Sequence, residues 1–131
     1  MTDKIEASLR MTGDNFSPAV LEKLTGWTLV RKKEVGDLTK RGKLTVGSAD
    51  LCPPKEVENN EDLFKGLEWI LEVVPSHLSS INKSGADDVY LDIAYYRDVA
   101  VFNLGFKPEI LKKIANLNMP FLISCYGDYM D

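Results

Sequence analysis

The strongest constraint on the fold is a short repeat. Residues 16–24 read FSPAVLEKL and residues 106–114 read FKPEILKKI, with four identical positions and two exchanges of one aliphatic residue for another. Each copy has a proline where a helix would start, and its apolar residues recur at helical spacing. A helix of about nine residues is not stable alone in water, so each copy must bury its apolar stripe against a shared sheet. Neither copy carries a reactive side chain at a matched position, so the repeat indicates architecture rather than chemistry.

Strands are predicted on both sides of each copy of the repeat. Apolar and polar residues alternate along residues 5–12 and 89–96, which is typical of strands with one buried and one wet face. The predicted strands are residues 5–12, 27–32, 44–46, 89–96 and 121–126, the predicted helices are residues 18–25, 61–83 and 108–118, and residues 33–42 and 48–60 are predicted as loops. Val20, Leu21 and Leu24 form the predicted apolar stripe of the first helix. Pro75 lies inside the longest helical pattern and should kink or divide it.

The elements therefore follow the order β-α-β-β-α-β-α-β, with an internal duplication of a strand-helix-strand unit. This order predicts an α+β fold, with one mixed β-sheet covered by helices on one face. Residues 1–131 are expected to form a single domain, because each half is too small to bury its own core. The first, fourth and fifth strands are expected near the centre of the sheet, and the third strand at an edge.

The composition is typical of a globular cytoplasmic protein. Hydrophobic residues make up 44% of the chain, and no run approaches the roughly 18 apolar residues that a membrane span needs. The first ten residues, MTDKIEASLR, lack the apolar segment of a signal peptide. Cys52 and Cys125 are isolated in the sequence, which favours two reduced thiols over a disulfide or a zinc site.

A search for catalytic residues finds no complete set. His77 is the only histidine, and with two distant cysteines it cannot supply the usual nitrogen and sulfur ligands of a metal site. Residues 36–44 contain two glycines but depart from a phosphate-binding loop, because an extra residue separates the glycines and no Ser or Thr follows Lys43. The sequence therefore predicts no catalytic residue, no metal site and no cofactor.

The charge distribution leaves two further functions open. Residues 23–55 carry a net charge of +5 and the rest of the chain carries −9. The basic residues of segment 31–43 are candidates for weak RNA binding, although the acidic pI and the absence of an aromatic RNA-binding strand motif disfavour it. A small-ligand-binding or enzymatic domain would use the TGD loop at residues 12–14, or His77.

Three segments resemble a known family. These are ASLRMTGDNFSPAVLEKLTG at residues 7–26, KKEVGD at residues 32–37 and PFLISCYG at residues 120–127. They resemble the domain of unknown function 4279 family of small bacterial proteins, whose members open with a strand, a Thr-Gly-Asp loop, a Ser-Pro helix and a basic loop. Members of that family close with a helix and a strand that runs into tyrosine or similar residues. The resemblance implies no catalytic residue.

The leading functional hypothesis is a non-enzymatic protein-binding protein in the cytoplasm, with a protein partner and no membrane partner. Its most specific form is an immunity protein that neutralises a cognate bacterial toxin, because an acidic protein without a catalytic set suits a basic toxin domain. Tyrosine mixed with acidic residues on the wet side of a strand is typical of a protein-binding surface. The predicted contact residues are Asp87, Asp88, Tyr90, Asp92, Tyr96 and Asp98.

Overall fold

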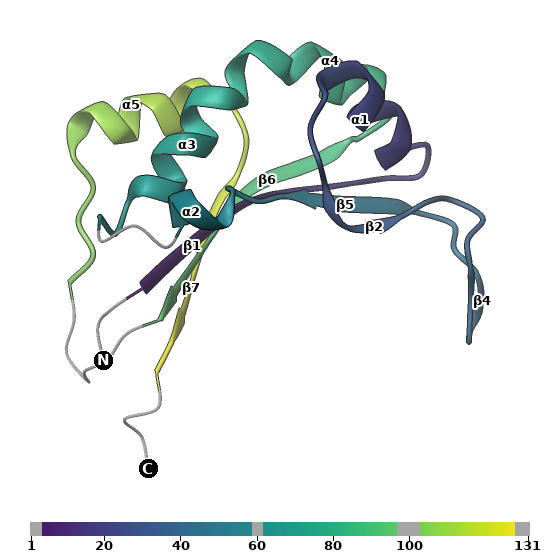
Figure 1. The fold of residues 1–131 in the computed structure, drawn as a ribbon, viewed down its shortest axis with the longest axis horizontal. Helices are drawn as coiled ribbons and strands as arrows, with labels where there is room; N and C mark the ends of the chain where they lie inside the picture. Colours follow the sequence, from purple (N-terminus) through teal and green to yellow (C-terminus); the bar gives the residue numbers. More distant parts are fainter. Residues whose placement is uncertain (1–3, 59–61, 97–102, 128–131) are drawn as a thin grey trace.

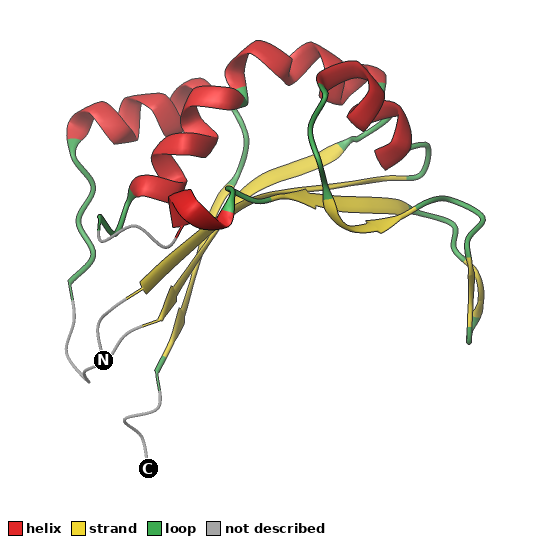
Figure 2. Ribbon diagram, viewed as in Figure 1, coloured by secondary structure: helices red, strands yellow, loops and turns green. Residues whose placement is uncertain are grey.

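The computed structural model describes residues 4–58, 62–96 and 103–127, which form two layers (Figures 1 and 2). One layer is a five-stranded sheet, and α1, α3, α4 and α5 cover one of its faces. The strands are β1 (Lys4–Gly13), β2 (Val30–Lys33), β3 (Leu38–Thr39), β4 (Gly42–Lys43), β5 (Gly47–Leu51), β6 (Asp88–Tyr96) and β7 (Phe121–Tyr126). The helices are α1 (Pro18–Thr25), α2 (Lys55–Glu58), α3 (Lys65–Val73), the 3-10 turn η1 (Pro75–His77), α4 (Leu78–Lys83) and α5 (Pro108–Asn116). The fold is therefore α+β, with a mixed sheet covered by helices, as the sequence predicts.

The sheet has the strand order β2-β5-β1-β6-β7. β1 is antiparallel to both of its neighbours, β5 and β6, and β2 is antiparallel to β5. β1 and β2 consequently run parallel to each other with β5 between them. β6 and β7 are parallel and adjacent. Each copy of the repeat thus connects two parallel strands along the chain. In the sheet β5 lies between β1 and β2, whereas β6 and β7 are adjacent.

The two copies of the repeat form α1 and α5, which begin at the predicted prolines. At the start of α1, Ser17 Oγ accepts a hydrogen bond from the Val20 N–H at 3.2 Å, and Gly26 ends the helix with a φ of 78°. The predicted apolar stripe of α1 is wrong in part, because Leu21 is buried but Val20 and Leu24 are exposed. α1 packs against α4 and β5 toward one side of the sheet, so much of its surface faces solvent.

The prediction for the third strand is wrong. Residues 44–46 form no strand, and the third strand of the sheet is β5, which falls in the predicted loop 48–60 and lies between β2 and β1 rather than at an edge. Its sequence, GSADL, has little intrinsic strand propensity, so its neighbours determine its conformation. Gly47 is needed at its start, because a Cβ there would overlap the carbonyl oxygen of Phe16.

The two edges of the sheet are β2 and β7. The expectation that the fifth predicted strand lies near the centre is therefore wrong, whereas β1 and β6 occupy the centre as expected. The segment predicted as a loop at residues 33–42 includes part of a small hairpin, formed by β3 and β4, which extends away from the main sheet (Figure 1).

The long helical pattern is divided at Pro75, as predicted, into α3, η1 and α4. The apolar faces of these helices and of the sheet enclose one continuous core, whose fully buried members include Leu9, Leu67, Ile70, Leu91 and Ile93. No helix in the described ranges has the length and apolar character needed to cross a membrane.

Candidate functional site on the open face of the sheet

The sheet has a second face, and in the described part of the chain no helix covers it (Figure 2). Side chains alternate between the two faces of a strand, so residues between the core positions of β1 and β6 point to this open face. The strand register places these residues side by side across the sheet. The open face carries Glu6, Ser8, Arg10 and Thr12 from β1, Ser48 and Asp50 from β5, Asp88, Tyr90, Asp92 and Tyr96 from β6, and Leu122, Ser124 and Tyr126 from β7.

A row of alternating charges, here called the charge ladder, crosses four strands on this face. It consists of Arg31, Asp50, Arg10 and Asp92, from β2, β5, β1 and β6 respectively. Arg31 Nε donates a hydrogen bond to Asp50 Oδ2 at 2.5 Å. Arg10 lies between the two carboxylates, with Nη1 3.9 Å from Asp50 Oδ2 and Nη2 3.3 Å from Asp92 Oδ2.

The carboxylates of the charge ladder are more buried than their position on an uncovered face would suggest. The side chains of Asp50 and Asp92 are only 11% and 14% exposed, whereas those of Arg10 and Arg31 are 40% and 59% exposed. The hydrogen bond to Asp50 raises the pKa of Arg31 above its usual value, and burial opposes this effect. Arg10 Nε is buried and has no hydrogen-bond partner among the described residues. The two carboxylates of the ladder therefore hold the guanidinium of Arg10 in place.

A shallow hollow of about 390 Å³ lies beside the ladder. It is lined by Arg10, Arg31, Lys33, Asp50 and Tyr90, among other residues. The thiol of Cys52 lies at the outer end of the ladder, 3.5 Å from Arg31 Nη2. Burial raises the pKa of this thiol, and the nearby guanidinium partly offsets the rise.

An aromatic pair lies on the open face of the parallel strands. The rings of Tyr96 and Tyr126 are stacked, with centroids 5.1 Å apart and an interplanar angle of 20°. Burial raises the pKa of Tyr96, and the carboxylate of Glu6 raises it further. Leu122 is exposed in the same row of β7. This part of the face therefore combines aromatic and apolar surface with the carboxylate of Glu6, whereas the part around Arg10 consists mainly of charged groups.

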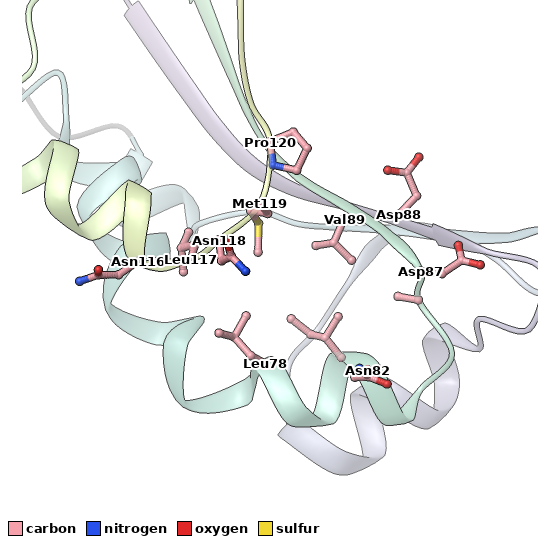
Figure 3. A pocket seen from close by; sticks show the side chains of 12 residues that line it. Leu78, Asn82, Asp87, Asp88, Val89, Asn116, Leu117, Asn118, Met119 and Pro120 are labelled. Carbon is pink, nitrogen blue, oxygen red and sulfur yellow. The ribbon is translucent and has the colours of Figure 1, made fainter.

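A separate groove of about 600 Å³ lies between α4 and the turn that joins α5 to β7 (Figure 3). Leu78 and Asn82 line it from α4, and Asn118 and Met119 line it from the turn. Asp87 lies at its end, just before β6 begins. The groove combines apolar walls with amide and carboxylate groups, and can hold an amphipathic group.

The structure divides the predicted contact residues between two places. Tyr90, Asp92 and Tyr96 share the open face of β6 with Asp88, which pairs with Thr12 at the start of the strand. Asp87 lines the groove, and Asp88 borders it as well. The carboxylate of Asp92 is already paired with Arg10. The remaining predicted residue, Asp98, lies outside the described residues.

The other sequence candidates are placed away from the open face or have structural contacts. His77 packs edge-on against Trp27, with ring centroids 4.9 Å apart. In the TGD loop, a Cβ on Gly13 would lie 2.5 Å from the carbonyl oxygen of Gly85, so close backbone packing explains this glycine. Within the basic segment, Lys32 forms an ion pair with Glu22 at 3.2 Å.

Sequence reasoning missed Arg10 and Asp50 as members of a site. Arg10 was visible in the polar row of the first strand, but nothing in the sequence places it between two carboxylates. Asp50 falls in a segment predicted as a loop, so its partners could not be inferred. Only the register between β1 and β5, which places Arg10 directly opposite Asp50, would have identified these two residues.

No group of three or more His, Cys, Asp or Glu side chains suited to a metal ion occurs within the ranges that the structure describes. Comparisons with protein-family models, curated proteins and solved structures found no match to this chain.

Proposed function

We propose that this chain is a non-enzymatic cytoplasmic protein that binds another protein through the open face of its sheet. In its most specific form it is an immunity protein that neutralises a cognate bacterial toxin. The observation that carries the proposal is the arrangement of the open face, where the stacked pair Tyr96 and Tyr126 lies on the same surface as the fixed guanidinium of Arg10.

The chemistry of this face suits a protein partner. Tyrosine and arginine are enriched at the energetic centres of protein interfaces, because they offer large contact areas and directed hydrogen bonds. The charge ladder holds Arg10 in place before binding, which reduces the entropy lost when a partner docks. The side chain of Arg10 is 40% exposed, so its guanidinium can also donate to a backbone carbonyl or carboxylate of the partner.

The acidic residues at the start of β6 supply the electrostatic part of the proposal. Asp87 and Asp88 are exposed and adjacent, whereas Asp92 is paired within the ladder. With a net charge of −4, the chain would attract a basic toxin domain over several ångströms and speed encounter at low salt. Membership of the domain of unknown function 4279 family, proposed on sequence resemblance, agrees with a small bacterial protein of this kind.

The proposal is tested with the protein encoded beside this gene. Co-expression should relieve the toxicity of that neighbour, and the purified pair should form a complex whose affinity isothermal titration calorimetry measures. Tyr96→Ala and Tyr126→Ala should each weaken binding roughly 30-fold, the effect of a truncated interface centre. Lys112→Ala, on an exposed position of α5, should leave the affinity unchanged.

Two results would contradict different parts of the proposal. If the neighbouring protein neither binds nor loses toxicity, the immunity role is wrong. If it binds with an affinity that neither tyrosine substitution changes, the partner uses another surface, and the open face is not the site.

Small-ligand binding in the groove of Figure 3 is the second candidate function, favoured by a lining that includes both asparagine and apolar residues. A thermal-shift screen of polar metabolites should then find a ligand whose stabilisation is lost in Asn118→Ala. RNA binding by the basic segment is weaker, because Arg31 and Lys32 are already paired with carboxylates. Filter binding to RNA at low salt tests it, and no retention would exclude it.

A further inference from the structure

The two edges of the sheet differ in chemistry. β2 reads VRKK, with three consecutive cations, and β7 reads FLISCY, with no charged residue. An exposed strand edge offers unpaired N–H and C=O groups to other chains, and proteins block this pairing with charges, bulges or prolines. β2 has two of these protections, because its pairing with β5 is irregular between Val30 and Lys33 and its cations repel a second copy.

β7 has none of these protections along its length. It is six residues long, pairs regularly with β6 and contains no proline. Leu122, Ile123 and Tyr126 are 45%, 42% and 51% exposed. Among the described residues no strand pairs with its outer side. A regular apolar edge of this kind is expected to be covered by another strand.

The parallel pairing fixes which backbone groups of β7 point outward. Leu91 N–H donates to the Pro120 carbonyl oxygen at 3.0 Å, so Leu122, Ser124 and Tyr126 direct their backbone groups toward β6. The alternate residues are therefore the ones whose N–H and C=O groups point away from the sheet. These are Phe121, Ile123 and Cys125.

We propose that the outer edge of β7 pairs with β7 of a second copy of this chain, antiparallel and across a two-fold axis. Ile123 would lie opposite Ile123 of the second copy, and Phe121 opposite its Cys125, so that all the outward-facing residues exchange backbone hydrogen bonds. An interface of this kind uses the same patch on both subunits. The two sheets then form one continuous sheet, with both helical layers on the same side.

The chemistry of the strand favours a second copy over a different peptide. A strand that pairs with itself across a two-fold axis places its central residue opposite the same residue of the second copy, so a strand whose charges all have one sign repels itself. β7 is the edge that carries no charge, whereas self-pairing of β2 would bring Arg31, Lys32 and Lys33 close to the same cations. The charged edge, β2, is thus protected from self-pairing and the uncharged edge, β7, is not, as a dimer through β7 requires.

The test is the molar mass of the whole chain in solution, measured by size-exclusion chromatography with light scattering over a range of concentrations. The expected mass is twice 14.7 kDa at the higher concentrations. Ile123→Lys should yield the monomer, because it sets two ammonium groups opposite each other at the centre of the interface. Val30→Lys introduces the same charged side chain at an exposed position of the other edge strand, β2, and should leave the dimer intact. Circular dichroism should confirm that both variants remain folded.

Amide hydrogen exchange supplies a second measurement that does not depend on a substitution. The N–H groups of Ile123 and Cys125 should exchange slowly at high protein concentration and faster on dilution. A monomer at all concentrations would overturn the proposal, and if those amides were also protected, another segment of the same chain would cover the edge. A dimer that persists in Ile123→Lys would place the interface elsewhere and equally overturn it.

Discussion

Asp50 is the residue on which the charge ladder depends. It is almost fully buried and contacts both arginines, so its removal would leave Arg31 and Arg10 without their shared carboxylate. We expect Asp50→Ala to lower the free energy of unfolding by about 2 kcal/mol, less than for a fully buried pair because both guanidinium groups reach solvent. Urea unfolding followed by tryptophan fluorescence measures this change.

The matched control is the ion pair of Lys4 and Glu6 on the same face. Lys4 Nζ lies 2.9 Å from Glu6 Oε2, but both side chains are exposed. Lys4→Ala should change the free energy of unfolding by less than about 0.5 kcal/mol. Equal losses in the two variants would mean that the burial of Asp50 contributes nothing to stability.

Glu58 gives the protein a specific pH dependence. Burial raises the pKa of its carboxyl above 4.5, Glu6 raises it further, and Lys4 partly opposes both. The folded state therefore binds this proton more tightly than the unfolded state, and stability falls as the pH rises from about 4.5 through the folded pKa. Glu58→Gln should raise the stability at pH 7 by roughly 0.5 kcal/mol, the group being partly exposed, and should have no effect below pH 4.

Glu22 provides the control of opposite sign. The hydrogen bond from the Leu29 N–H lowers the pKa of its carboxyl, so Glu22 stabilises the fold above about pH 4.5 and loses this contribution as the pH falls through the folded pKa. Glu22→Gln should therefore lower stability at pH 7. Urea titrations at pH 4 and pH 7 compare both variants, and changes of the same sign at pH 7 would contradict the assignments.

At the scale of elements, glycines allow three segments to pack closely where β1 ends: Gly13 at the end of β1, Gly47 at the start of β5 and Gly85 before β6. Gly85 has a φ of +96°, and a Cβ on it would overlap the carbonyl oxygen of Asn15. Gly26 has a similar φ of +78°, but a Cβ there would meet nothing within 4 Å. We expect Gly26→Ala to cost about 1 kcal/mol, the penalty of the left-handed conformation alone, and Gly85→Ala to cost about 3 kcal/mol or more.

Thermal and urea unfolding of the two glycine variants separate backbone conformation from close packing. Equal losses would show that the turn at Gly85 relaxes easily. That outcome would remove the structural explanation for the glycines of this region, including Gly13 in the TGD loop.

The elements that the sequence predicted well are those with local signals. Ser17, Pro18 and Gly26 mark the ends of α1 through interactions within one or two turns, and Pro75 divides the central helix for a local steric reason. β5 could not be predicted in this way, because GSADL becomes a strand only between two others that supply its hydrogen bonds. The edge position of β7 was equally hidden, because its apolar sequence resembles that of a central strand.

The same distinction applies to the candidate site. Alternation along β6 was enough to predict that Tyr90, Asp92 and Tyr96 share a face. The stacking of Tyr96 on Tyr126 depends on the parallel register of β6 and β7, which no local pattern specifies. Arg10 joins the site for a similar reason, through two registers at once.

At the scale of the whole molecule, β1 is central, and its pairing with β6 joins the two halves of the chain. A fragment of residues 1–87 would lack β6 and β7 and expose one side of β1, together with the core residues that pack on Leu91 and Ile93. We expect this fragment to show no cooperative unfolding transition by circular dichroism, because its remaining apolar surface cannot form a closed core. A cooperative transition would show that the N-terminal half is a folding unit by itself.

The central position of β1 also determines when the protein can fold during its synthesis. β1 is translated before its second neighbour, β6, which begins only at Asp88. At roughly 5–20 residues per second, one side of β1 waits several seconds for its partner. During that interval its apolar residues, Ile5 to Met11, are accessible to chaperones that bind extended chains. The sheet is therefore completed only after β6 and β7 have been made.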